Sequence, residues 1–515
     1  MRVVHLSVAL AALLGTATAS VSVKYTGQPP TGYEVTFRYA NASAHQVQIA
    51  GGLLPFTDQF HTTPAFSAAY DPHDYRPGDF FVANLNVNTT GNLGPQGTYS
   101  GFYMNDTGHG EWEWTAPFPS GTYSYAYIID CDLGPRCAGT EPGQVPGLTF
   151  YNDPENPPFQ NDVLQFNHSI FQVPYDREYQ YYPALNLDFD FALPVPAGHQ
   201  GKALAVNYSS PGSTYPAKDV HDLALYLPPS YDANCSTPYP VLYLSHGGGG
   251  TAFDWPNLAK AFNIIDNLIH DHWIPPTIVV CPAFYNLGCN DTGPTPDLMI
   301  CVRENYLRIL LPFIESTYRA SSDPDHRAFA GLSLGSELTY EMYINATTNF
   351  TYFGHFSGAR GPAASDTDTE GYISNATVAA NPALADRGVF VGFGNFDIAF
   401  SDCRSLELAL ELAGVGFLSR KPTSKMATTT TDNMEMQYKP AEPMQASPSN
   451  NAQEHAHTSD CEAQQPKKER TFLGMRGGGL IRTLPPLPFH AFFRRGGEGD
   501  KDVDMLGCGS VLMNT

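Results

Sequence analysis

The sequence predicts an α/β domain with a parallel-type central sheet, preceded by a small all-β sandwich and followed by a tail without regular periodicity. From Ser20 to about Asp162, apolar and polar residues alternate in short stretches such as Glu34 to Tyr39, which is typical of half-buried strands. From Asp219 onward, short continuous apolar runs alternate with amphipathic segments. This second pattern is typical of buried parallel strands covered by helices.

The expected elements of the second domain follow from that alternation. Strands are expected at residues 223–227, 241–244, 278–281, 327–330 and 389–391, and helices at 255–268, 302–318, 336–344 and 401–413. Gly414 is well placed to end the last helix. In the first domain a further strand is expected at residues 123–129, after the turn signal Pro119-Ser120-Gly121.

Length and charge limit the possible functions. A chain of 515 residues is too long for one core, and its net charge of −23 repels nucleic acid and anionic membrane surfaces. We therefore expect a neutral or weakly charged substrate, with no nucleic-acid or membrane partner.

The N-terminal residues predict secretion. Arg2 precedes an apolar run from Val3 to Leu14, and small residues end at Ala19, so residues 1–19 are expected to be a signal peptide of an extracellular protein. The run is too short to span a bilayer. Asn-x-Ser/Thr sequons predict a glycoprotein; there are ten, at Asn41, Asn88, Asn105, Asn167, Asn207, Asn234, Asn290, Asn345, Asn349 and Asn375.

Nine cysteines in an oxidising compartment favour disulfides over metal sites. Cys131 and Cys137 are expected to close a tight loop, while the other pairings stay open. No Cys/His spacing resembles a zinc site, so we expect no metal and no cofactor.

The domain boundaries are predicted from changes in composition. We expect the signal peptide at 1–19, the sandwich at 20–165, a linker at 166–218, the α/β domain at 219–418 and a tail at 419–515. The tail carries 12 basic and 11 acidic residues, whereas residues 1–418 carry 16 and 40. With its low complexity, it is expected to be disordered or to be a mispredicted translation.

The stretch Phe329 to Leu338, FAGLSLGSEL, has the G-x-S-x-G pattern of a nucleophile elbow. Its small glycines allow a sharp turn that exposes Ser333 at the carboxyl edge of the sheet. The expected strand before it and helix after it are the context that the mechanism needs, so Ser333 is the predicted nucleophile rather than part of a structural turn.

A second motif, LYLSHGGGG, begins at Leu242 and runs from an apolar strand into a glycine loop. Free amides of Gly247, Gly248 and Gly249, together with the amide of Leu334, are expected to hold the oxyanion of a tetrahedral intermediate. A phosphate-binding loop would end in Gly-Lys-Ser/Thr, which is missing here. His246 is expected to hold the shape of the loop.

The third element is an acid. Asp397 follows the strand at residues 389–391 and comes after the serine, as the chain order Ser, Asp, His requires. It would orient the histidine base. Asp402 is the alternative, and either could instead cap a helix.

These motifs together resemble the esterase D superfamily of α/β-hydrolases, which includes feruloyl, acetylxylan and enterochelin esterases. The resemblance covers residues 219–418 and implies an α/β-hydrolase fold with Trp255 near the substrate. Residues 20–162 resemble the immunoglobulin-like early-set domains, akin to starch-binding modules, that precede such esterases.

The resemblance fails at the base. The family pattern continues with Gly-Gly-His followed by a tryptophan, and no such motif follows Leu418. The histidines after Asp397 are His455, His457 and His490, of which His490 in an apolar stretch is the remaining candidate. This break suggests a mispredicted exon boundary or a frame error.

The resemblance implies a secreted serine esterase acting on a small-molecule or polysaccharide ester, with feruloyl or acetyl esters of plant cell walls as the first expectation. A siderophore esterase and acyl transfer to a sugar are alternatives. A non-catalytic carbohydrate-binding protein is another, in which Trp112 and Trp114 would stack on sugars; core packing is the favoured interpretation of these tryptophans.

Overall fold

The computed structural model describes residues 18–50, 72–77, 102–130, 151–160, 169–183, 187–358, 373–393 and 399–420. Several predictions lie outside these residues: most of the signal peptide, the Cys131–Cys137 pair, Asp397, His455, His457 and His490. The predicted cleavage after Ala19 would fall within the first strand, where Thr18 and Ala19 pair with Ala40 and Tyr39. Among the described residues, no helix is long and apolar enough to cross a membrane.

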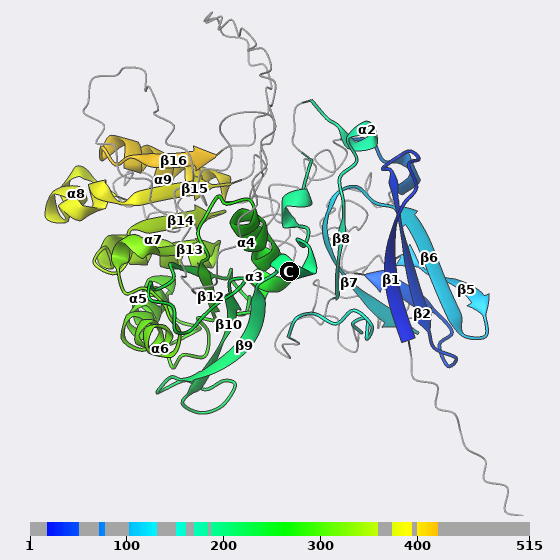
Figure 1. Ribbon diagram of the computed structural model, residues 1–515, viewed down its shortest axis with the longest axis horizontal. Helices are drawn as coiled ribbons and strands as arrows, with labels where there is room; N and C mark the ends of the chain where they lie inside the picture. The colour runs from blue at the N-terminus through cyan, green and yellow to red at the C-terminus, as the bar shows by residue number, and fades with distance from the viewer. Residues whose placement is uncertain are drawn as a thin grey trace, which may run out of the picture.

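The N-terminal region is a β-sandwich of two four-stranded sheets (Figure 1). The first sheet has the order β1 (Thr18–Tyr25), β2 (Tyr33–Ala40), β6 (Glu111–Pro117) and β5 (Asn105–Gly108). The second has the order β4 (Phe102–Tyr103), β3 (Val47–Ala50), β7 (Gly121–Ile129) and β8 (Ser169–Val173). Their inner faces share an aromatic core, in which Phe37 of β2 packs edge-on against Tyr125 of β7 and Phe171 of β8. The predicted sandwich is therefore confirmed.

The two tryptophans of β6 belong to that core. Trp112 is only 7% exposed, and the ring centre of Trp114 lies 5.8 Å from that of Phe37. Because both rings face inward, they are not available to stack on a sugar, and the core interpretation is the correct one.

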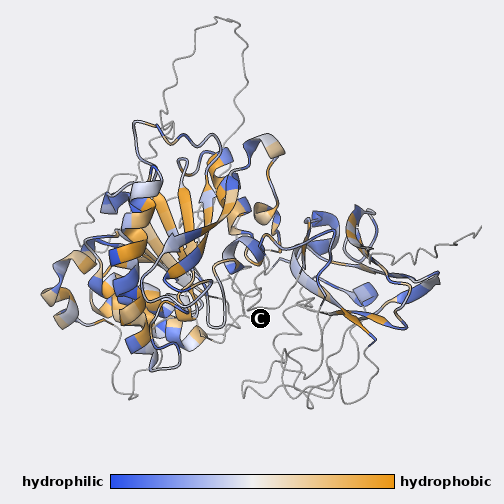
Figure 2. Cartoon of the chain, turned by 90° about the horizontal axis from the view of Figure 1, so that it is seen from below, coloured by the Kyte–Doolittle hydropathy of each residue, from blue (hydrophilic) through white to orange (hydrophobic). Residues whose placement is uncertain are grey.

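The C-terminal region is built on one eight-stranded sheet. Its order is β16-β15-β14-β13-β11-β12-β10-β9, in which the pairs β9–β10 and β10–β12 are antiparallel and the other neighbours are parallel. The strands are β9 (Lys202–Ser209), β10 (Val220–Leu227), β11 (Val241–Ser245), β12 (Ile278–Pro282), β13 (Arg327–Leu332), β14 (Tyr352–Phe356), β15 (Gly388–Gly392) and β16 (Phe417–Arg420). Figure 2 shows their apolar character at the centre of the domain.

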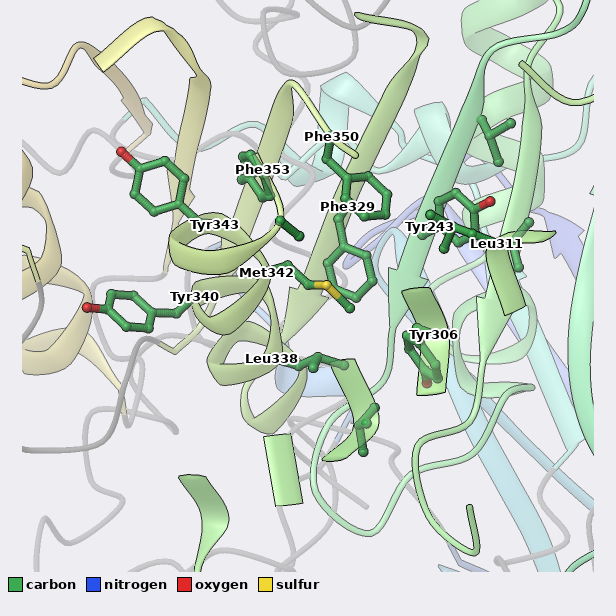
Figure 3. Packing of buried hydrophobic residues seen from close by; sticks show 14 of the residues in the cluster. Tyr243, Tyr306, Leu311, Phe329, Leu338, Tyr340, Met342, Tyr343, Phe350 and Phe353 are labelled. Atoms are coloured by element: carbon green, nitrogen blue, oxygen red, sulfur yellow. The ribbon is translucent and has the colours of Figure 1, made fainter. Parts of the chain in front are cut away.

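Helices cover both faces of this sheet. One face packs against α5 (Thr295–Asn305), α6 (Leu311–Thr317), α7 (Leu334–Asn345) and α9 (Phe400–Leu412), with a π-helical turn at Tyr306–Leu310 joining α5 to α6. The other face packs against α3 (Asp254–Asn257) and α4 (Ala261–His270). Figure 3 shows the first layer, where Phe329 and Phe353 of the sheet meet Leu338 and Met342 of α7. This is the α/β-hydrolase arrangement that the sequence predicted.

The remaining helical segments are short. They are α2 (Arg177–Gln180), α8 (Asn375–Ala380) and the 3-10 turns Pro72–Asp74, Asp190–Ala192, Ala197–His199, Pro324–His326 and Pro382–Asp386. In the described residues, a disulfide joins Cys289 to Cys301 and so ties the loop after β12 to α5, while Cys235, Cys281 and Cys403 are buried thiols.

Two predicted boundaries differ from the structure. The segment 166–218, predicted as a linker, contains β8 of the sandwich and β9 of the large sheet. β9 was missed because it is an edge strand with mostly exposed or half-buried side chains, so it lacks the continuous apolar run of its neighbours. The α/β domain also continues past Leu418, since β16 pairs with β15 as far as Arg420.

The sandwich and the sheet domain are joined by polar and aromatic contacts. On α4, the amide of Asn263 donates to the carbonyl of Ala192 at 2.9 Å, and the amide of Asn267 donates to that of Leu193 at 2.8 Å. The backbone amide of Phe159 donates to the Asn257 side chain at 2.9 Å. Residues 187–193 therefore bridge β8 and α4.

Candidate active site

Ser333 occupies the sharp turn between β13 and α7. Its backbone has φ 51° and ψ −116°, a conformation that costs a non-glycine residue of order 1–3 kcal/mol. The turn is held from below, because the Ser333 amide donates to the Phe356 carbonyl at 2.9 Å and its carbonyl accepts from the Ser336 amide at 2.8 Å. The half-buried serine thus stands in the geometry of a nucleophile elbow.

The two flanking glycines are needed for close packing. A Cβ at Gly331 would lie 2.1 Å from the Gly335 carbonyl oxygen, and a Cβ at Gly335 would lie 2.4 Å from the carbonyl oxygen of His246. Real Cβ atoms do not approach backbone so closely. The first turn of α7 can therefore press against the end of β11 only because both residues lack a side chain.

The glycine loop lies beside the elbow. An ideal Cβ at Gly247 falls 3.6 Å from the Ser333 Cβ, and one at Gly248 falls 3.9 Å from the Leu334 Cβ. Gly248 is exposed, and Leu334 is the first residue of α7, so its amide has no partner within the helix. These two amides are the best candidates for oxyanion donors. The Gly249 amide is not, because it donates to the Tyr285 hydroxyl at 3.1 Å.

His246 holds the glycine loop from within the domain. Its Nδ1 lies 2.8 Å from the Gly247 carbonyl, and its Nε2 accepts the backbone amide of Phe284 at 3.3 Å. This pair of contacts requires the tautomer with the proton on Nδ1. The ring is stacked on Phe284 with 4.1 Å between ring centres, and burial lowers the pKa of His246 to about 4. It is therefore a neutral support whose nitrogens are both used.

A second buried histidine supports the same peptide from the other side. His221 Nε2 lies 3.0 Å from the carbonyl of Ala283, and its Nδ1 lies 2.9 Å from the carbonyl of Tyr215. The hydroxyl of Tyr306 also donates to the Ala283 carbonyl, at 2.8 Å. The Ala283–Phe284 peptide is thus fixed at both its oxygen and its nitrogen.

A third histidine lies beneath the elbow. His355 of β14 is fully buried, and its Nδ1 lies 3.2 Å from the Ser336 hydroxyl, which donates to the Gly358 carbonyl at 2.7 Å. Burial lowers the pKa of His355 to about 4. An ideal Cβ at Gly358 would lie 2.8 Å from the Ser333 carbonyl oxygen, so this chain of contacts positions the backbone behind the serine.

The acidic side of the site is described only in part. Asp397 lies outside the described residues. Its alternative, Asp402, is half-buried in the first turn of α9, and burial raises its pKa. Burial, and then the nearby carboxylate of Asp402, raise the pKa of Glu337 to about 7. Glu337 lies one turn after Ser333 on α7 and Asp402 lies on α9, so each of these two helices places a carboxyl group on this side of the site.

Two predicted contacts are not supported by the described residues. None of the described histidines makes a contact with the Ser333 side chain, so the base is not placed. Trp255 was predicted near the substrate, but it is only 5% exposed and its ring packs 6.0 Å from that of Phe356, between α3 and the sheet. It supports the strand behind the elbow instead.

Sequence reasoning missed three residues that contact the glycine loop or the residues that support it, namely Tyr285, Phe284 and His221. Each is separated from His246 or Gly249 by at least 25 residues, and no local pattern marks the pairing. They were not detectable without the fold.

Comparisons with known proteins find similarity to esterases. Residues 217–414 match the family model described as a putative esterase. Endo-1,4-beta-xylanase Y of Acetivibrio thermocellus is 28% identical over 241 residues, which are 44% of this chain and 20% of that protein. An endo-1,4-beta-xylanase/feruloyl esterase of Xylanibacter ruminicola is 35% identical over 124 residues, which are 23% of this chain and 16% of that protein. The chain therefore spans a fifth or less of the length of these relatives.

Solved structures of similar fold are more distant. A mutant feruloyl esterase module from Clostridium thermocellum complexed with sinapinate is 23% identical, covering 47% of this chain and 86% of that chain, with a TM-score of 0.36. The enterobactin esterase FES from Shigella flexneri, in the presence of 2,3-di-hydroxy-N-benzoyl-glycine, is 13% identical, covering 78% and 91%, with a TM-score of 0.44.

Proposed function

We propose that the protein is a secreted serine hydrolase that cleaves carboxylic esters through an acyl-enzyme on Ser333, and the match of residues 217–414 to the family model described as a putative esterase supports this. The observation that carries the proposal is the strained Ser333 at φ 51°, with Gly247 beside it. A strand–turn–helix serine next to a glycine loop that offers the Gly248 amide is the arrangement that acyl transfer requires.

The proposed reaction has two steps. The Ser333 oxygen attacks the ester carbonyl, and the amides of Gly248 and Leu334 bind the oxyanion that forms, a contribution of about 3 kcal/mol per donor. The alcohol then leaves, and water attacks the acyl-enzyme to release the acid. A histidine oriented by Asp397 takes and returns the proton, and without such a base kcat would fall by about a million-fold.

We propose esters of plant cell-wall polysaccharides, with feruloyl or acetyl groups, as the substrates. The relatives' names support this class, since both are xylanases and one is also a feruloyl esterase. A siderophore trilactone and acyl transfer to a sugar are the alternative reactions. Release of ferulate, acetate or linear siderophore by the purified protein from the three substrates would discriminate between the hydrolytic ones.

A fluorophosphonate probe tests the catalytic part directly. The full-length native protein is expected to be labelled, and Ser333→Ala is expected to abolish labelling. Ser316→Ala is the matched control, because Ser316 lies on the exposed surface of α6 and should not affect labelling. Absence of labelling in the native protein would sink the esterase proposal in favour of a non-catalytic carbohydrate-binding protein, and equal labelling of Ser333→Ala would show that Ser333 is not the nucleophile.

The base needs its own test. His490→Ala is expected to reduce labelling if His490 serves as the base, and to leave it unchanged if it does not. Sequencing the transcript across the Leu418 codon tests whether residues 419–515 result from a frame error or a mispredicted exon boundary. A reading that restores a Gly-Gly-His motif would supply the base, whereas a transcript that confirms residues 419–515 would refute the frame error.

A further inference from the structure

Two of the buried histidines near the elbow and the glycine loop have contacts that a neutral ring satisfies. His246 has one acceptor and one donor as neighbours, the Gly247 carbonyl and the Phe284 amide, so a single ring proton serves both contacts. The Nδ1 of His355 lies 3.2 Å from the Ser336 hydroxyl, and burial lowers the pKa of His355 to about 4. Both histidines are therefore neutral at neutral pH.

His221 of β10 differs, because both of its ring nitrogens face carbonyl oxygens. Its Nδ1 lies 2.9 Å from the Tyr215 oxygen, its Nε2 lies 3.0 Å from the Ala283 oxygen, and the residue is only 1% exposed. A carbonyl oxygen only accepts hydrogen bonds, and a neutral imidazole has one N–H to donate. In the neutral form, one ring nitrogen would turn its lone pair toward an oxygen at hydrogen-bond distance. The imidazolium form, with two N–H groups, satisfies both contacts.

The carboxylate of Asp222 lies close enough to compensate the charge of a protonated His221. Its Oδ1 is 3.9 Å from His221 Nδ1, and its side chain is only 12% exposed. Two phenols near this pair stay neutral, because burial raises the pKa of Tyr208 on β9 and of Tyr306 above the usual range of a tyrosine. The remaining titratable neighbour is His246, just after β11, which is neutral as well. Among the described residues near His221, Asp222 therefore supplies the negative charge that favours the protonated ring.

Two planar peptide units connect His221 to the glycine loop. In the Ala283–Phe284 peptide, His221 binds the oxygen and His246 binds the N–H, so holding one group sets the direction of the other. In the Gly247–Gly248 peptide, His246 Nδ1 binds the oxygen, and the N–H on the opposite side is the amide of Gly248. The proposed oxyanion donor is therefore linked to His221 through hydrogen bonds and rigid peptide planes alone.

We propose that His221 is a positioning residue of the esterase site, that it acts as an imidazolium, and that loss of one ring proton displaces the Gly248 amide. This inference rests on the proposed function, because it concerns the rate at which Ser333 reacts. In the neutral form one of the two carbonyl contacts of His221 becomes repulsive, so the ring or the Ala283–Phe284 peptide must shift. The shift passes through His246 to the glycine loop, and an oxyanion donor that is no longer preorganised loses part of its effect.

The expected effect on the rate is partial and has a distinctive sign. The Tyr306 hydroxyl also donates to the Ala283 carbonyl, at 2.8 Å, so a neutral His221 loosens this peptide without freeing it. We expect labelling of Ser333 by a fluorophosphonate to slow about tenfold between about pH 6 and about pH 9, less than the loss of a whole oxyanion donor. A histidine base gives the opposite trend, because it must be neutral to accept the serine proton.

NMR of the folded full-length protein, isotope-labelled at the histidine nitrogens, tests the protonation state without any assay of activity. One histidine signal, assigned by its absence in His221→Gln, should show a proton on both ring nitrogens at about pH 7. Time courses of fluorophosphonate labelling over the same pH range measure the positioning role. The labelling rate of the wild type should fall on the alkaline side with the same midpoint as the titration of the His221 signal.

Three variants separate the charge of His221 from a purely structural role. His221→Gln removes the charge, so it should label about tenfold more slowly than the wild type at about pH 6 and without the alkaline fall. Asp222→Asn should keep the fall but move it to lower pH, because the ring loses its anionic neighbour. His270→Gln is the matched control, since His270 is exposed at the end of α4 and its variant should follow the wild type.

Two results would overturn this inference and leave the esterase proposal standing. They are a His221 ring with a single proton at about pH 7, and a labelled wild type whose rate shows no alkaline fall or shares that fall with His221→Gln. If His221→Gln does not fold, the signal that moves in Asp222→Asn identifies His221, and the two pH profiles decide. A wild type that the probe labels at no pH overturns the esterase proposal and the positioning role together.

Discussion

At the scale of single residues, His246 connects the glycine loop to the interior of the domain. Its Nδ1 holds the Gly247 carbonyl, and this contact fixes the orientation of the peptide whose amide belongs to Gly248. If Gly248 is an oxyanion donor, the loop must be rigid, because a preorganised donor gains its effect by not having to move.

We therefore expect His246→Ala to slow fluorophosphonate labelling of Ser333 by about 100-fold, the usual effect of losing one oxyanion donor. His326→Ala is the matched control, since His326 lies before the amino end of β13 and, among the described residues, its side chain hydrogen-bonds only to Ser321. Rates of labelling measured by quenched time courses give the result. Equal rates for His246→Ala and the wild type would mean that the loop keeps its shape without this side chain.

Glu337 predicts a dependence of stability on pH. Its pKa is raised to about 7 in the folded protein, mainly by burial, from the ordinary value of 4.5 for a glutamate. The folded state therefore binds more protons than the unfolded state between these values, and stability falls as pH rises from about 4.5 to 7.

The variant Glu337→Gln should remove part of that fall. After allowance for solvent screening of a half-buried group, we expect it to be about 1 kcal/mol more stable than the wild type at pH 8 and no more stable at pH 4. Urea unfolding at both pH values measures the difference. Glu411→Gln, an exposed carboxyl group on α9, is the control. If Glu337→Gln raised the free energy of unfolding equally at both pH values, this would contradict the raised pKa of Glu337.

At the scale of elements, the site depends on α7 meeting the end of β11 without any side chain between them. Gly335→Ala would place a Cβ 2.4 Å from the His246 carbonyl oxygen and 2.6 Å from that of Ser245. Neither contact is the flexible end of a side chain, so backbone must move. We expect a loss of at least about 3 kcal/mol in the free energy of unfolding, which marks a severe core substitution.

Gly198→Ala is the matched control for this prediction. A Cβ at Gly198 meets nothing within 4 Å, and that backbone is not in the left-handed region, so its effect should stay within about 0.5 kcal/mol. Denaturant unfolding of both variants gives the comparison. Similar stabilities would show that the elbow and the glycine loop can separate at little cost.

The elements also show what sequence alone could and could not provide. Central strands such as β11, β12 and β13 were predictable because they are buried on both faces and read as continuous apolar runs. The elbow at Ser333 was predictable because its chemistry lies within five residues. β9 was not predictable, since an edge strand has a weak pattern, and the pairing of His246 with Phe284 depends on tertiary structure across 38 residues.

At the scale of the whole molecule, the sandwich is packed onto the layer that follows the glycine loop. Phe159 packs edge-on between Phe253 and Phe262, with ring centres 6.1 Å and 6.4 Å away. On α4, Asn267 donates to the carbonyls of Phe191 and Leu193, at 3.1 Å and 2.8 Å. Because α3 and α4 follow the glycine loop, these contacts connect the segments on either side of β8 to the part of the sheet domain that carries that loop.

This arrangement predicts that the two domains unfold together. In Asn267→Ala, the carbonyls of Phe191 and Leu193 lose a shared donor, at a cost of about 1–3 kcal/mol if they stay buried. Calorimetry of the full-length wild type should show one transition, and Asn267→Ala should lower its midpoint or split it in two. Leu412→Ala is the control, because that side chain is 63% exposed on α9 and should leave the transition unchanged. Two transitions in the wild type, unaffected by Asn267→Ala, would mean that the sandwich is an independent module tethered to the sheet domain.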